Sequence, residues 1–255
     1  MHMMRAPIIV MAALLAGATA ARAAGEEITY PDRHWSWEGP FGTFDLPQLQ
    51  RGLQVYTEVC STCHGLRLVA YRDLAALGYT EDQVKAYAAN YEVQDGPDDQ
   101  GEMYMRAAKP SDRFVSPFPN EQAARAANNG ALPPDLSLMP KARKDGPDYL
   151  PALLTGYAEA PEGFELLAGM NYNEYFPGHQ IAMPQPLFAD AVTYADGTAA
   201  TADQMAEDVT AFLMWAAEPK LEARKSMGIK VLIFLVIFTA MLYAVKKKVW
   251  ANVEH

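Results

Sequence analysis

The sequence predicts a mainly helical domain with long loops, exported from the cytoplasm and followed by one C-terminal transmembrane helix. Three observations carry this prediction: an N-terminal export signal, an apolar run near the C-terminus, and apolar residues recurring every three or four positions between them. The 255 residues, half of them hydrophobic, suffice for one well-buried domain with appendages. A short strand pair between Ala191 and Tyr194 is the only β-structure that we expect.

The first 23 residues have the three parts of a secretory signal peptide. Arg5 gives a positive tip, Pro7 to Ala16 form a short apolar block, and Ala21 to Ala23 form an Ala-x-Ala exit. We expect cleavage before Ala24, which removes residues 1–23. A retained N-terminal anchor is the alternative, but the apolar block is shorter than the ~20 residues that span a bilayer.

The apolar run near the C-terminus predicts a transmembrane anchor over residues 226–249. The stretch from Ser226 to Val245 gives a helix of ~30 Å at ~1.5 Å per residue, provided that the Lys230 side chain extends towards the headgroups. A buried core helix is the alternative, and the lysine triplet at 246–248 argues against it. The positive-inside rule keeps these lysines and the short tail, residues 250–255, in the cytoplasm.

Both ends therefore predict a single-pass inner-membrane protein whose residues 24–225 form a periplasmic domain. The 21 basic and 31 acidic residues give a formal charge of −10, which becomes −12 when Arg5 and Arg22 leave with the signal peptide. This charge excludes nucleic acid as a partner, whereas membrane lipid is expected around the anchor. The acidic surface is either merely solvated or attracts a basic protein partner.

The first half of the domain begins with an irregular lead-in from Pro31 to Pro40, rich in aromatic residues, Gly and Pro. A helix is expected from Leu46 to Val59, because Asp45 is a good N-cap and Pro47 fits the first turn. A second helix is expected from Asp73 to Ala89.

The middle of the chain should be dominated by loops. Glu92 to Pro119 is expected to be a loop, because its central Asp/Gly/Pro run breaks regular structure. Short helices are expected from Asn120 to Asn128, before an exit that tolerates left-handed backbone, and from Asp148 to Tyr157. Gly169 to Pro186 is expected to be a long irregular segment.

The last helix of the soluble domain should open at Thr201. Gln204 completes a capping-box pattern with Thr201, and an apolar stripe follows. Pro219 ends this helix.

The two cysteines of the chain lie in the pattern Cys60-Ser61-Thr62-Cys63-His64, which is typical of c-type haem attachment. At a helix end, this spacing turns both sulfurs to one side, where they can add to the haem vinyl groups. His64 then provides the proximal imidazole for the iron. A disulfide or redox pair does not need His64, and a zinc site would need two more ligands nearby.

The sixth iron ligand is less determined by the residues alone. The chain has thirteen methionines, and His34 and His179 are further options. Met183 stands out because the segment from Gln180 to Pro186 holds it in a stiff loop between prolines, where a thioether can be directed at a metal. His/Met coordination would fill both axial positions and so favours electron transfer over catalysis.

These residues and their surroundings resemble the cytochrome c1 family along nearly the whole mature chain. The haem pattern alone indicates only the haem class, whereas two longer runs are specific to this family. The matching runs are Tyr71 to Leu74, Val93 to Pro97, Gly101 to Arg106, Ala124 to Ser137, Leu154 to Tyr157 and Asn171 to Gly178.

The resemblance implies a class I cytochrome c-like haem domain carrying one haem c, covalently bound through Cys60 and Cys63, with Met183 as the distal ligand. It further implies that Arg143 reaches a haem propionate, although Arg143 could equally be a solvated member of a basic cluster with its lysine neighbours. The other pocket residues that it implies are Tyr149, Asn128, Pro133, Leu153 and Phe176. Some bacterial relatives clamp the distal loop with an extra cysteine pair, which this chain lacks.

The implied function is electron transfer from the Rieske iron-sulfur subunit to a soluble or tethered cytochrome c, within a dimeric cytochrome bc1 complex that includes cytochrome b. The chain would then belong to a quinol–cytochrome c oxidoreductase without transforming a substrate itself. The acidic segment from Glu92 to Glu102 is a candidate docking face for a basic partner. The alternatives are a free-standing tethered cytochrome c and a haem enzyme, such as a peroxidase, with an open axial site.

Overall fold

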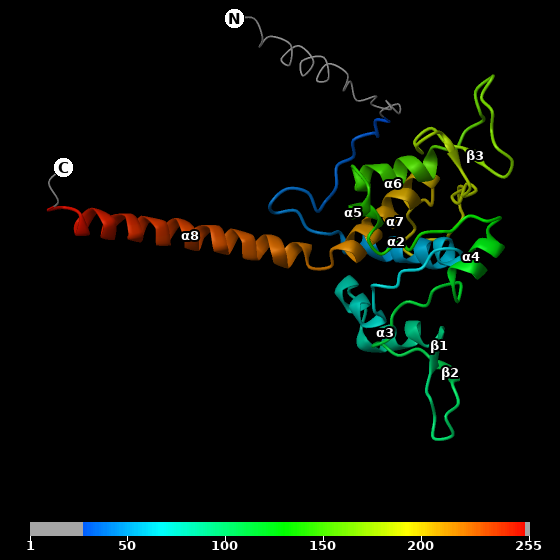
Figure 1. Ribbon diagram of the computed structural model, residues 1–255, viewed down its shortest axis with the longest axis horizontal. Helices are drawn as coiled ribbons and strands as arrows, with labels where there is room; N and C mark the ends of the chain where they lie inside the picture. The colour runs from blue at the N-terminus through cyan, green and yellow to red at the C-terminus, as the bar shows by residue number, and fades with distance from the viewer. Residues whose placement is uncertain (1–27, 253–255) are drawn as a thin grey trace, which may run out of the picture.

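The computed structural model describes residues 28–252, which form a mainly helical domain followed by one long C-terminal helix (Figure 1). Helices α2 (Leu46–Glu58), α6 (Gly146–Thr155) and α7 (Ala202–Ala217) pack together at the centre. Long loops surround these helices, so the predicted mainly α class is confirmed. The predicted signal peptide, residues 1–23, lies outside the described residues.

The main contact within the domain joins α2 to α7, and it depends on a glycine and a buried ion pair. A Cβ atom at Gly52 would lie 2.0 Å from the carbonyl oxygen of Asp208, so the two backbones approach closely there. Arg51 binds the Asp208 carboxylate with Nε at 2.9 Å from Oδ2 and Nη2 at 3.1 Å from Oδ1. Asp208 is fully buried, and Gln204 Nε2 also donates to it at 3.0 Å.

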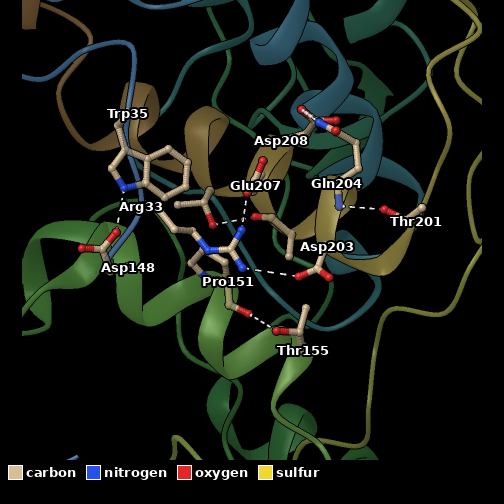
Figure 2. A network of polar contacts seen from close by, with 12 residues as sticks. Arg33, Trp35, Asp148, Pro151, Thr155, Thr201, Asp203, Gln204, Glu207 and Asp208 are labelled. Atoms are coloured by element: carbon tan, nitrogen blue, oxygen red, sulfur yellow. Dashed lines mark hydrogen bonds and ion pairs between the residues drawn. The ribbon is translucent and has the colours of Figure 1, made fainter. Parts of the chain in front are cut away.

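The irregular lead-in is fastened to α6 and α7, as Figure 2 shows. Trp35 Nε1 donates to Asp148 Oδ1 at 2.8 Å, which ties the lead-in to the first turn of α6. Arg33 pairs with Glu207 and with Asp203, the latter at 3.3 Å, and both acids belong to α7. The predicted irregular backbone of this segment is confirmed.

The predicted helix from Asp73 to Ala89 is wrong, because the region forms two elements. A 3₁₀ helix, η2 (Tyr71–Leu77), ends at Gly78, whose φ of 91° no continuing helix would allow. Helix α3 (Glu81–Ala88) then starts from a new N-cap at Thr80, whose amide donates to the side chain of Gln83 at 2.8 Å.

The predicted loop after α3 contains a β-hairpin that projects from the domain (Figure 1). Strands β1 (Glu92–Asp95) and β2 (Tyr104–Ala107) pair antiparallel. Arg106 holds the hairpin by pairing with Asp95 in β1 and with Asp112, whose Oδ2 lies 2.6 Å from Nη1. Arg106 and the Lys109 amide lower the pKa of Asp112 to about 2. Strands this short carry too few residues for an alternating pattern.

Two shorter helices lie between the hairpin and α6. Helix α4 (Glu121–Ala127) is capped by Asn120, and the left-handed exit predicted after it is confirmed at Asn129 (φ 52°) and Gly130 (φ 88°). Helix α5 (Met139–Ala142) was not predicted, because a single turn has no periodicity to detect.

Helix α6 begins at Gly146, two residues before the predicted start at Asp148, because Pro147 suits its first turn. The segment from Gly169 to Pro186 is irregular as predicted, apart from a two-residue ladder between β3 (Asn171–Tyr172) and β4 (Gln180–Ile181).

The segment from Ala191 to Tyr194 forms a bend and irregular backbone rather than the expected strand pair. The capping box predicted at α7 is only half formed. The Thr201 hydroxyl accepts from the Gln204 amide at 3.1 Å, but the Gln204 side chain turns to Asp208 because that buried carboxylate needs a further donor.

Helix α8 (Leu221–Val249) projects away from the domain (Figure 1). It contains the predicted anchor and starts five residues before it. Among the described residues it alone is long and apolar enough to cross a membrane, and none of its apolar window is buried by the domain. The alternative of a buried core helix is therefore wrong.

Candidate haem-binding site

The Cys-x-x-Cys-His segment follows directly on α2. Val59 ends α2, and a 3₁₀ turn, η1 (Cys60–Thr62), reverses the chain. The amides of Cys63 and His64 both donate to the Cys60 carbonyl, at 3.1 and 2.9 Å. The cysteines are half-buried and not joined in a disulfide, and burial raises the pKa of the Cys60 thiol to about 12.

The imidazole of His64 is oriented by the backbone of a distant loop. Its Nδ1 lies 2.8 Å from the carbonyl oxygen of Pro134, so Nδ1–H donates and Nε2 is left as the free nitrogen. The Tyr56 hydroxyl donates to the His64 carbonyl at 3.1 Å and fixes the backbone. Burial lowers the pKa of His64, which favours the neutral imidazole that binds metals.

The loop that carries Pro134 is fastened to the residues after His64. The Leu136 amide donates to the Gly65 carbonyl at 2.9 Å, and the Arg67 amide donates to Asp135 Oδ2, also at 2.9 Å. These bonds hold the Pro134 carbonyl against the ring. Sequence reasoning missed this role, although the Pro133-Pro134 pair signals rigid backbone.

Two side chains hold Met183 in place through hydrogen bonds to its backbone carbonyl. That oxygen accepts from the Tyr157 hydroxyl at 3.1 Å and from Asn171 Nδ2 at 3.2 Å. Fully buried Asn173 donates to the Leu153 carbonyl at 2.8 Å, which joins the Met183 region to α6. The Met183 side chain is half-buried against the core. Sequence reasoning missed these three donors.

Arg143 and Tyr149 lie close together. Burial raises the pKa of Tyr149, and the nearby Arg143 guanidinium partly offsets that rise. Lys141 instead pairs with Glu218, 3.1 Å away, so the three basic residues from 141 to 144 do not form one uniform solvated cluster. Arg143 itself is exposed at the surface.

The remaining predicted pocket residues lie at several places in the domain. Leu153 is buried in α6, whereas Pro133 and Phe176 are half-buried in loops. Asn128 ends α4, and its side-chain amide donates to the Ala124 carbonyl at 2.7 Å. A cavity of about 840 Å³ between α2 and α3 is lined by none of the predicted haem residues.

These residues fit a covalently held haem better than the alternatives. Cys60, Cys63, His64, Phe176 and Met183 are each only half-buried, so part of each side chain stays accessible. His64 has one nitrogen engaged and the other free. Within residues 28–252 no group of three or more His, Cys, Asp or Glu side chains is placed to hold a metal ion.

Comparison with known proteins decides the family. A model of the family described as the Cytochrome C1 family matches residues 35–253 of the chain. The chain belongs to the cytochrome c1 family. Cytochrome c1 from Rhodospirillum rubrum is 52% identical, with 96% of this chain and 95% of the relative covered. A mitochondrial cytochrome c1, heme protein, from Saccharomyces cerevisiae is 50% identical, with 93% of this chain and 77% of the relative covered.

A longer relative from Bradyrhizobium diazoefficiens is named cytochrome b/c1. It is 52% identical, and the match covers 87% of this chain but only 36% of that relative. Members of the cytochrome c1 family carry covalent haem c and serve as the electron-transfer subunit of the bc1 complex. This chain has the two cysteines and the histidine that the attachment requires.

Proposed function

We propose that this chain holds one haem c through thioethers to Cys60 and Cys63, with His64 Nε2 and the Met183 sulfur as the axial ligands. The observation that carries the proposal is the Cys-x-x-Cys-His turn, with its imidazole already oriented by Pro134, in a cytochrome c1. When bound, haem c supplies a one-electron iron couple. With both axial positions filled by protein, the chain has no open site for a substrate.

Each protein group has a distinct part in this proposal. The Pro134 carbonyl fixes the tautomer and the rotation of His64, and the Tyr157–Asn171 pair fixes the backbone of Met183. The guanidinium of Arg143 and the hydroxyl of Tyr149 hold a propionate, as opposite charge and hydrogen bonding favour. Pro133, Leu153 and Phe176 provide the apolar lining, and Asn128 adds a polar side chain whose amide is held by the Ala124 carbonyl.

Met183 is preferred to His34 and His179, the other two candidate ligands, because Tyr157 and Asn171 hold the backbone at Met183 by hydrogen bonds. His34 is exposed in the lead-in. His179 stacks on Tyr172 at 5.8 Å between ring centroids, and its Nδ1 lies 3.3 Å from the Asn173 carbonyl.

The Tyr157→Phe variant tests the positioning of Met183. Loss of one hydrogen bond, worth about 1 kcal/mol, should loosen the loop so that the ferrous protein binds carbon monoxide more readily while keeping its covalent haem. The measurement is a carbon monoxide titration followed optically. The Tyr104→Phe variant, at an exposed site on β2, is the matched control and should behave like the parent. Equal affinities for carbon monoxide in the parent, the Tyr157→Phe variant and the Tyr104→Phe control would refute this role for Tyr157.

Within the bc1 complex, we propose that the chain accepts an electron from the Rieske iron-sulfur subunit and passes it to a soluble or tethered cytochrome c. The relative whose name joins cytochrome b and c1 supports cytochrome b as a direct partner. The complex is proposed to be dimeric. Purification in mild detergent through a C-terminal tag should recover haem b and an iron-sulfur signal; a free-standing cytochrome would arrive with neither.

The proposed topology follows from the two ends of the chain. Residues 1–23 are removed, residues 24–225 form the periplasmic haem domain, and residues 226–249 span the inner membrane. The tail, residues 250–255, stays in the cytoplasm, since the lysines at 246–248 follow the positive-inside rule.

The β1–β2 hairpin is the proposed docking surface for a basic cytochrome c. Asp95 is paired with Arg106, and Asp98 accepts from two backbone amides of its own turn, so these two acids serve the hairpin. Glu92, Asp99 and Glu102 remain exposed and are available to a partner.

The rate of electron transfer to a basic cytochrome c should fall as ionic strength rises, because salt screens attraction between exposed charges. The Asp99→Asn/Glu102→Gln double variant should lower the rate at low salt and flatten the salt dependence. A matched control, Glu162→Gln/Glu165→Gln, neutralises two acids in another surface loop and should keep the parent response. Stopped-flow absorbance gives the rates, and a flat salt response in the parent would refute the docking surface.

A further inference from the structure

A short loop in the lead-in, residues 37–44, is fastened to the first turns of α8. Lys225 Nζ donates to the carbonyl oxygens of Trp37 and Gly42, the latter at 3.3 Å. Both stems of the loop are thus held by one side chain of α8. In Figure 1 the blue lead-in reaches back along the start of α8, towards the side on which that helix leaves the domain.

Two further bonds close this loop and make it stiff. The Phe44 amide donates to Glu222 Oε1 at 2.8 Å, which adds a second link to α8. The Thr43 amide donates to the Ser36 carbonyl at 3.0 Å, so the chain returns to the point where it left the core. The loop is therefore a fixed projection.

The tip of the loop is an apolar side chain with no cover. Phe41 is 79% exposed, whereas Trp37, the first residue of the loop, and Trp35 before it are buried and stack at 4.7 Å between ring centroids. A Cβ atom at Gly42 would lie 2.0 Å from the Glu38 carbonyl oxygen, so the backbone of the loop closes tightly on itself beside Phe41.

The links to α8 set the level of Phe41 along that helix. Lys225 lies two residues before Met227, where the exposed apolar surface of α8 begins. At ~1.5 Å per residue this separation is about 3 Å along the axis, less than one helical turn. Phe41 is the neighbour of Gly42, which Lys225 holds, so it lies near the level at which α8 would enter a bilayer.

We infer that the loop of residues 37–44 is a second membrane contact, in which Phe41 inserts into the boundary between headgroups and acyl chains. Aromatic and apolar side chains are stabilised at this depth. Together with α8, the contact gives the domain two fixed points on the bilayer and so limits its tilt. The inference rests on the proposal that α8 spans the membrane.

Site-directed spin labelling of the full-length, haem-loaded chain in phospholipid vesicles tests this contact. Cys60 and Cys63 are the only cysteines and are used by haem attachment, so a Phe41→Cys variant offers a single thiol for a nitroxide label. Power saturation compares label accessibility to oxygen, which concentrates in lipid, and to a water-soluble nickel chelate. Met105→Cys on β2 is the exposed control, and Leu235→Cys reports on the middle of α8.

The expected result is an oxygen-to-nickel accessibility ratio at Phe41 several times that at Met105, and lower than that at Leu235. A ratio at Phe41 equal to that at Met105, with a high ratio at Leu235, would overturn the second contact and leave the membrane span intact. Low ratios at both Phe41 and Leu235 would overturn the span as well. Poor access of both reagents to Phe41 would indicate contact with protein and also overturn the inference.

Each labelled protein is first checked for one covalent haem per chain. If Phe41→Cys does not load haem, the label is placed at the adjacent exposed position by Pro40→Cys. Its oxygen-to-nickel accessibility ratio is then compared with those at Met105 and Leu235 in the same way.

Discussion

Replacing Met183 with leucine should preserve the covalent haem and lower its midpoint potential by more than about 0.1 V, since axial ligands set haem potentials over a range of ~0.8 V. Leucine keeps the volume of the side chain but offers no sulfur to the iron. The backbone donors from Tyr157 and Asn171 do not depend on this side chain, so the loop should stay in place. The vacated position should also admit carbon monoxide.

An optical redox titration measures the potential of the Met183→Leu variant, and a pyridine haemochrome spectrum confirms that the haem is still covalent. The matched control is Met103→Leu, because Met103 is an exposed methionine beside the hairpin. An unchanged potential in Met183→Leu would show that another residue is the distal ligand.

Replacing Arg51 with methionine should destabilise the domain by about 3–5 kcal/mol, because it leaves the buried Asp208 carboxylate without its partner. Gln204 would remain as a donor but carries no charge. The α2–α7 contact should loosen, and α2 leads directly into Cys60. Chemical denaturation followed by tryptophan fluorescence measures the loss.

Two further variants separate the buried pair from a general effect of charge. The Arg51→Met/Asp208→Leu double variant removes both charges and should recover most of the lost stability. Lys85→Ala removes an exposed cation that pairs with Glu81 at 3.0 Å and should leave the unfolding transition unchanged. A stable Arg51→Met single variant would contradict the importance of the buried pair.

The sequence predicted those parts of the fold that depend on local signals. Asp45 and Thr201 each cap their helices as expected, since an N-cap needs only the amide three residues on. The break at Gly78 was overlooked because the flanking residues continue a helical pattern, although the Thr80 to Gln83 capping box marks the restart. The β1–β2 hairpin depends on the bonds of Arg106 to residues on both sides, which no local pattern reveals.

The candidate site likewise has a part that the sequence predicts and a part that it does not. The haem attachment residues are adjacent in sequence, so their spacing predicts their chemistry. The groups that orient the ligands are not: Pro134 is 70 residues from His64, and Tyr157 is 26 residues from Met183. Such contacts are set by tertiary packing and become visible only in the folded chain. That the chain belongs to the cytochrome c1 family was predicted from long runs such as Ala124 to Ser137, and the comparisons confirm it.

The most direct test is the absorption spectrum of the reduced, purified full-length chain before and after the addition of carbon monoxide. The proposed closed haem site predicts a ferrous c-type spectrum that carbon monoxide leaves unchanged, because His64 and Met183 occupy both axial positions. A colourless protein after maturation in a competent host, or a spectrum that shifts readily with carbon monoxide, would contradict the assignment as an electron carrier.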